Sequence, residues 1–272
     1  MHLINTIIDA ALRAYFAAFG WAPPAVGLTV LSAAVGVGML WVFRKTSNQE
    51  RMKAVKRRVY AALLELRVYA DEPGVTWRAQ KSLFGANLRY MGLALKPALW
   101  MLLPVGLLLI HLESFYGRAP LPVSGETVVT MGMAPSWNPE SPAPTLAAPP
   151  EVEVDGPPVR VVDAREVSWR IRPKAECSGQ LQFTVDGQAV TKSIEAGGAR
   201  PRYIPGKSVR SPLEAIWSPG EAIAVPQVEW IEVRYPEASL RIFGFAMNWL
   251  VWFFVVSMVA ALLLKSRFGV VL

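Results

Sequence analysis

The residue types best suited to acid–base, nucleophilic or metal chemistry are scarce in this chain. Its 272 residues include one cysteine, Cys177, and two histidines, His2 and His111. A metal site needs three or four ligands at close spacing, and nucleophilic catalysis needs a base beside the nucleophile. The sequence has neither pattern, and its glycines do not form a phosphate-binding loop. We therefore expect no catalytic residue, no cofactor and no metal, in a protein that is not an enzyme.

Lys96 is the most informative single residue, because it lies inside an apolar stretch. Residues 90–112 are apolar except for Lys96 and His111. A charge at the centre of a bilayer costs about 2.5 to 3.5 kcal/mol on insertion scales. Either Lys96 lines a wet groove open to the cytoplasm, or its ammonium group extends to the lipid headgroups. Asn248 and Ser257, in a later apolar stretch, either face that groove or make hydrogen bonds between helices.

Three apolar stretches have the length of transmembrane helices. Hydrophobic residues make up 53% of the chain and charged residues 18%, and the apolar ones are concentrated in blocks. Residues 25–43, 90–112 and 243–264 are each long enough, at about 1.5 Å per residue, to cross a hydrocarbon core of roughly 30 Å. We predict three transmembrane helices, the second of them bent at Pro97 and Pro104.

The segment 44–89 reads as a basic helical hairpin. It holds eleven Lys or Arg against four Asp or Glu, a net charge of +7 that equals the net charge of the whole chain. Ser47 and Glu50 have the form of a capping box, residues 71–74 form a turn, and Thr76 is the expected N-cap of the second helix. Basic loops stay in the cytoplasm. We therefore place the protein in a bacterial inner membrane, with the N-terminus outside and the C-terminus inside.

Four basic residues near the start of this hairpin are candidate contacts for a partner: Lys53, Lys56, Arg57 and Arg58. Anionic lipid headgroups are one partner, at about 1 kcal/mol per basic residue. A cytosolic partner such as the RNA surface of a ribosome is a second, and an incoming polypeptide is a third. DNA is not expected, because the basic charge lies on a short loop rather than on a folded domain.

Residues 113–242 have a different character and are predicted to form an extracytoplasmic domain. A proline-rich linker over 136–158 is expected to be flexible or extended. Residues 159–238 are rich in strand signals, with alternating apolar and polar residues and a hairpin turn at Asp186-Gly187. Thr127 to Met131 is a weaker strand candidate. Short strands with Gly and Pro turns favour a small β-sandwich.

Two terminal segments complete the domain organisation. Residues 1–24 are predicted to form an amphipathic helix in the membrane interface, and residues 265–272 a cytoplasmic tail. The predicted fold class is thus an α+β membrane protein. It combines three transmembrane helices, a cytoplasmic helical hairpin and an extracytoplasmic β-sandwich-like domain.

The order of these parts resembles the YidC/Oxa superfamily of membrane insertases, in its minimal three-span branch. The similarity lies in a span ending in Trp-Val-Phe-Arg-Lys-Thr at residues 41–46, the hairpin that follows, and the layout around Phe-Tyr-Gly-Arg at 115–118. The resemblance implies three helices around a groove that eases polar segments of a client protein into the bilayer. It also implies that Lys96 is the cation of that groove.

Two hypotheses on function follow. The first is a non-enzymatic membrane protein of insertase-like architecture that helps to insert or assemble membrane or envelope proteins. The second is a structural or accessory subunit of a larger membrane complex, whose β domain contacts extracytoplasmic partners. An insertase binds varied clients, whereas a subunit keeps constant partners.

Overall fold

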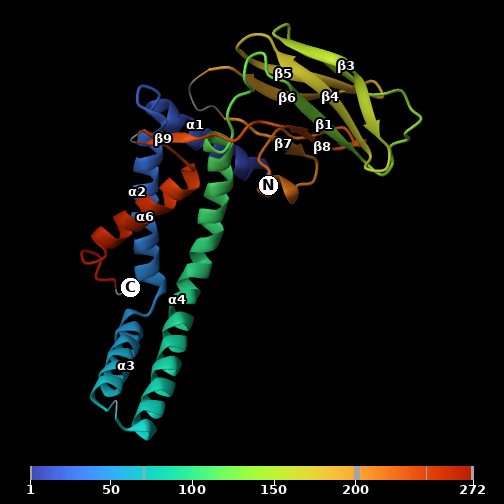
Figure 1. Ribbon diagram of the computed structural model, residues 1–272. Helices are drawn as coiled ribbons and strands as arrows, with labels where there is room; N and C mark the ends of the chain where they lie inside the picture. The colour runs from blue at the N-terminus through green and yellow to red at the C-terminus, as the bar shows by residue number, and fades with distance from the viewer. Residues whose placement is uncertain (1, 70, 199–202, 243, 271–272) are drawn as a thin grey trace. The chain divides into compact units, whose positions relative to one another are not determined.

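The computed structural model describes residues 2–69, 71–198, 203–242 and 244–270. The chain divides into two compact units. One consists of Met1–Gly27 and Leu107–Trp249 and contains the β domain (Figure 1). The other consists of Leu28–Gly106 and Leu250–Leu272 and is helical. The fold class is α+β, with two long apolar helices and a β-sheet domain.

Two helices are long and apolar enough to cross a membrane. They are α2, Pro24–Thr46, and α4, Pro73–Tyr116. Proline suits the first position of both helices, because its missing N–H would have no partner there. Arg44 and Lys45 lie in the last turn of α2, where cations interact favourably with the helix dipole.

The third apolar helix, α6, is shorter than the sequence suggested. It covers Trp249–Leu264, only 16 residues, or about 24 Å at the usual rise. The residues before it form a two-stranded hairpin of β9, Leu240–Ile242, and β10, Phe245–Met247. Phe243, the expected start of the span, lies outside the described residues. The apolar composition of residues 243–264 therefore predicted the helix correctly. It did not predict that the first residues of this stretch form strand β10.

Helix α6 packs against α2 through a close backbone contact. A methyl group built on Gly36 would overlap the backbone carbonyl of Ser257. The indole N–H of Trp252 donates to the Thr29 hydroxyl at 2.8 Å. Small residues permit such close approach between apolar helices.

The basic hairpin forms as predicted, with different helix starts. Helix α3 covers Gln49–Val68, and its N-cap is Asn48, whose side chain accepts from the Arg51 N–H at 3.0 Å. The prediction of a capping box at Ser47 is therefore wrong, since Asn48, one residue later, is an equally good N-cap residue. Helix α4 already begins at Pro73, so Thr76 is not its N-cap. The Thr76 hydroxyl instead donates to the Tyr69 carbonyl at 3.0 Å and ties the turn together.

Helix α4 continues through Pro97 and Pro104 without a break (Figure 1). Each proline removes one backbone donor and crowds the preceding turn. Pro97 is buried, and Met101 one turn later is buried too. These residues lie on the face of α4 that packs inside its own unit, together with Tyr90 and Leu93.

The β domain is built from two sheets. The larger one has the order β3-β4-β1-β8-β7 and the smaller one β2-β5-β6, both antiparallel. The strands of the larger sheet are β1 Thr127–Met133, β3 Val152–Val161, β4 Glu166–Pro173, β7 Lys207–Val209 and β8 Val228–Val233. Those of the smaller sheet are β2 Thr145–Ala147, β5 Cys177–Val185 and β6 Gln188–Ala196.

One core joins the two sheets. Val167, Trp169 and Ile171 of β4 are buried, as the alternation predicted. The Trp169 ring contacts Phe183 of β5 with 5.2 Å between centroids. The β5–β6 turn has positive φ at Asp186 and Gly187, as expected of a two-residue hairpin. The prediction of a β-sheet domain with two sheets packed around one core is therefore confirmed.

One strand prediction is confirmed and one linker prediction needs correction. The weaker strand candidate from Thr127 is confirmed as β1, a central strand between β4 and β8. The proline-rich segment 136–158 is not simply a linker, because it contains β2 and the first part of β3. Strand β3 tolerates Pro157 and Pro158 because it lies at the sheet edge and its pairing shifts between Asp155 and Val159.

A buried ion pair holds the β domain together. Lys192, fully buried on β6, donates to the Glu221 carboxylate at 3.0 Å, to the Ser208 hydroxyl at 2.9 Å and to the Pro205 carbonyl. The Glu221 carboxylate also accepts from the Ser193 N–H at 3.0 Å and the Ser208 hydroxyl at 2.7 Å. The pair therefore links β6 to β7 and to the loop before β8.

The two partners of this ion pair respond differently to burial. For Glu221, burial acts to raise the pKa, but the Lys192 charge and the hydrogen bonds from Ser193 and Ser208 lower it to about 2. For Lys192, burial outweighs the attraction of Glu221 and lowers the pKa. Three donors point at the Glu221 carboxylate and stabilise its charged form.

Candidate functional site

Lys96 lies on a face of α4 that is exposed within its own unit. The residues around it form an open hollow of about 760 Å³. They recur at intervals of three and four and therefore share one side of the helix. They are Gly92, Leu95, Lys96, Leu99, Trp100, Leu103 and Pro104. We call this set the Lys96 face. Within the described part of the chain, Lys96 is its one charged member.

This face differs from the packed face of α4. Successive residues of an α-helix are about 100° apart, so Lys96 points well away from its buried neighbour Pro97. Leu99, Trp100 and Leu103 are each more than half exposed. In the most apolar 18-residue window of α4, 11% is buried, compared with 33% for α2. The hollow is therefore lined by a single helix and is open to a molecule approaching from the side.

The other two predicted groove residues are Ser257, in the same unit as Lys96, and Asn248, in the other unit. Ser257 is buried in α6, where its hydroxyl donates to the Phe254 carbonyl at 3.0 Å and its backbone packs on Gly36. Asn248 belongs to the other compact unit and is exposed. Neither residue lines the hollow around Lys96. Their positions fit helix packing for Ser257 and a surface position for Asn248.

The basic residues predicted as partner contacts lie along α3. Lys53, Arg57 and Arg58 are exposed and Lys56 is partly buried. Arg58 differs from Lys53 and Arg57 because it lines a cleft between α3 and α4. The predicted set is thus an exposed basic surface, and one of its members points toward the second helix of the hairpin.

A polar cluster that the sequence did not reveal lies in the β-domain unit. Helix α1, His2–Ala18, carries Asp9, which accepts from the Tyr203 hydroxyl at 2.8 Å. The Arg13 guanidinium lies 4.2 Å from the centroid of the Tyr203 ring. His111 Nε2 is 3.8 Å from the other Asp9 oxygen, and His111 Nδ1 donates to the Leu107 carbonyl at 2.8 Å. These contacts attach α1 to the end of α4 and to the segment before β7.

Burial also affects the protonation of the Asp9 carboxyl in this cluster. It raises the pKa of the Asp9 carboxyl, and the Tyr203 hydroxyl, His111 and Arg13 offset only part of that rise. Asp9 and Arg13 were visible in the sequence as charges interrupting an apolar helix. Their partner Tyr203 is 194 positions from Asp9, so no local pattern could have paired them.

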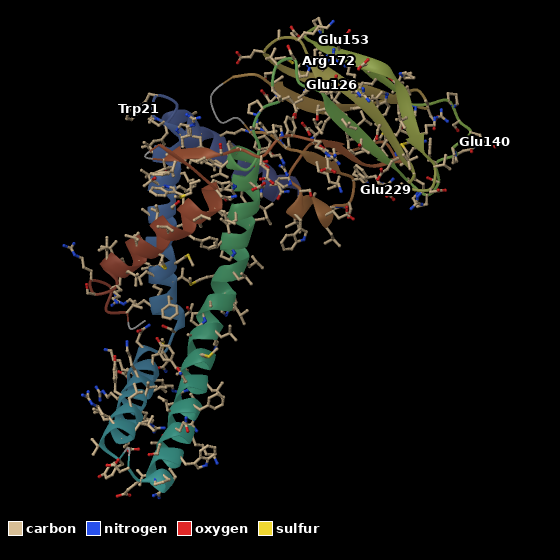
Figure 2. All side chains as sticks on the ribbon, in the orientation of Figure 1. Trp21, Glu126, Glu140, Glu153, Arg172 and Glu229 are labelled. Carbon is tan, nitrogen blue, oxygen red and sulfur yellow. The ribbon has the colours of Figure 1, made fainter. Side chains whose placement is uncertain are left out.

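The turn after α1 presents an aromatic side chain to the surroundings. Trp21 is 83% exposed and projects from this turn (Figure 2). Exposed tryptophan is typical of the boundary between lipid and water. This fits the expected interfacial location of residues 1–24, which stays a prediction.

Comparison with known proteins identifies no relative. The sequence matches no protein-family model, and neither the curated proteins nor the solved structures contain a match.

Proposed function

We propose that this chain is an integral membrane protein of insertase-like architecture. It has no enzymatic activity of its own, and it helps other membrane or envelope proteins to insert or assemble. It lies in a bacterial inner membrane, with the basic hairpin and C-terminus in the cytoplasm and the β domain outside. Its partners are membrane proteins and anionic lipids, with a ribosome as a further candidate on the hairpin side.

The observation that carries this proposal is a cation on an uncovered apolar helix face. Lys96 is exposed within the part of α4 that is apolar enough to cross a membrane. Lipid tails cannot solvate an ammonium group, so the local environment must supply water or a polar partner. A client segment passing along the Lys96 face would bring polar groups to the cation and apolar groups to Leu99 and Leu103.

A second candidate, a subunit of a stable complex, is favoured by one feature of the same site. The hollow at Lys96 is lined by one helix only, and its shape would also suit a permanently bound helix of another protein. A partner helix with a carboxylate facing Lys96 would remove the cost of the lone charge.

Photo-crosslinking distinguishes these proposals. A photoreactive residue at Leu99 on the Lys96 face should crosslink to newly made membrane proteins of varied size, and the crosslinks should fade as synthesis stops. The same residue at Met101, which is 8% exposed, is the matched control and should stay near background. Lys96→Leu should lower client insertion several-fold while leaving the protein folded.

The outcomes separate cleanly. One constant crosslinked partner that persists after synthesis stops would support the subunit alternative and contradict the insertase proposal. Equal background labelling at Leu99 and Met101 would contradict both.

A further inference from the structure

A cleft between the two helices of the basic hairpin gathers three arginines. It has a volume of about 430 Å³ and lies where α3 and α4 run side by side in opposite directions (Figure 1). The lining residues take one face of each helix, at spacings of three and four. They are Arg51, Ala54, Val55 and Arg58 on α3, and Arg89, Gly92 and Leu93 on α4.

The three guanidinium groups at this cleft have no acidic partner in the part of the chain that the structure describes. No carboxylate lines the cleft, and among the described residues Arg51, Arg58 and Arg89 make no salt bridge. Elsewhere in the chain arginine does pair, as Arg172 does with Glu126 on the β domain (Figure 2). The hairpin cleft is therefore a concentration of positive charge without its counter-charge.

The floor of the cleft is small and apolar. Ala54 and Gly92 leave space between the helices, and a methyl group built on Gly92 would meet nothing within 4 Å. Val55 and Leu93 supply apolar walls. Guanidinium groups bind phosphate through paired hydrogen bonds, and the apolar walls suit the carbon chain attached to it.

The position of the cleft along the chain indicates where the phosphate comes from. Arg89 directly precedes the apolar part of α4, and Arg51 follows the end of α2 by one short turn. In the proposed topology, both points lie at the cytoplasmic boundary of the bilayer. Phosphate groups of lipids are concentrated at that depth, and anionic lipids attract basic residues there.

We propose that this cleft binds the headgroup phosphate of an anionic phospholipid, held by Arg51, Arg58 and Arg89. The inference rests on the proposed membrane location and adds a defined lipid site to it. It also distinguishes these residues from Lys53 and Arg57, which lie on α3 outside the cleft. A bound headgroup would neutralise the repulsion among the three guanidiniums and hold α3 against α4.

Native mass spectrometry of the full-length protein in mild detergent tests the proposal. Offered equal amounts of phosphatidylglycerol and phosphatidylcholine, the wild type should retain phosphatidylglycerol in roughly tenfold excess or more. The variant Arg51→Gln/Arg58→Gln/Arg89→Gln should lose that preference. The matched control Arg67→Gln/Arg78→Gln/Lys81→Gln removes the same charge from exposed hairpin positions outside the cleft and should keep that preference.

A second pair of variants fills the space without changing any charge. Gly92→Leu should displace the headgroup, whereas Gly85→Leu should not, although a side chain at Gly85 also meets nothing within 4 Å. Circular dichroism should show equal helix content in all variants. If the arginine variant does not fold, the glycine pair decides the question alone.

Three results would overturn the proposal. They are equal retention of the two lipids by the wild type, equal loss in the two triple variants, and complete displacement by millimolar inorganic phosphate, which would identify free phosphate as the ligand. Failure of the crosslinks at Leu99 would leave this binding unaffected. The lipid site and the proposed client contact therefore stand or fall separately.

Discussion

Replacing Gly36 with alanine should destabilise the α2–α6 pair, whereas the same change at Gly38 should not. The added methyl group at Gly36 overlaps the backbone carbonyl of Ser257, and backbone cannot move aside as a flexible side chain can. Forcing an extra carbon into a packed contact typically costs about 1 to 3 kcal/mol. We expect Gly36→Ala to lower the stability of the helical unit by at least this amount, measured by unfolding in mixed SDS micelles followed by circular dichroism.

Gly38 supplies the matched control for this change. It lies two residues away on the same helix, and a methyl group built there meets nothing within 4 Å. Alanine favours helix over glycine by about 1 kcal/mol, so Gly38→Ala should be neutral or slightly stabilising. Equal stability of the two variants would show that α6 does not pack on α2 at Ser257.

Replacing Lys192 with methionine should have the largest effect within the β domain. The change leaves the Glu221 carboxylate without its cation, and removing one partner of a buried ion pair typically costs about 3 to 5 kcal/mol. The single cysteine, Cys177, provides the measurement, since it is only 6% exposed and a thiol reagent reaches it when the domain opens. We expect Cys177 in Lys192→Met to react at least a hundredfold faster than in the wild type.

Lys174 is the control for Lys192, because it pairs with Glu153 at 3.2 Å on the surface of the same domain. The side chains of Lys174 and Glu153 are each about half exposed, and exposed ion pairs of this kind contribute little stability. Lys174→Met should leave the labelling rate of Cys177 within a few-fold of the wild type. A similar rate in Lys192→Met would contradict the role of the buried pair.

Acid should act on the same pair in a defined direction. The pKa of Glu221 in the folded domain is about 2, below its ordinary value of 4.5. Its contribution to stability is therefore complete above pH 4.5 and is lost as the pH falls from 4.5 through about 2. Glu221→Gln has no carboxylate to protonate, so the labelling rate of Cys177 in this variant should depend less on pH over that range.

Local patterns predicted the elements whose signals are contiguous in sequence. The period-two burial of β4, the Asp186-Gly187 turn and the helical hairpin all depend on residues within a few positions of one another. The apolar lengths of α2 and α4 are local signals of the same kind. In these segments the helix or strand propensity agrees with the pattern of buried residues, so the sequence alone was sufficient to predict the element.

The features that sequence could not supply depend on contacts between distant segments. Thr127 begins a central strand because β4 and β8 flank it, and neither neighbour is close to it in the chain. Tyr203 meets Asp9 across almost the whole chain. The 243–264 stretch is uncharged throughout, so the charge pattern gave no sign that a short strand precedes α6. Lys96 is exposed on an apolar helix, and its role in a groove stays a prediction. That Ser257 does not line the hollow around Lys96 depends on helix packing, which no local pattern shows.

Cysteine accessibility tests the central claim, that the basic hairpin and the β domain lie on opposite sides of a membrane. In a Cys177→Ser background, single cysteines replace Lys53 on α3 and Asp163 on the β domain, both exposed positions. A membrane-impermeant maleimide added to spheroplasts should label the cysteine at 163 at once, and the one at 53 only after the membrane is permeabilised. Labelling of both from the same side would contradict the account.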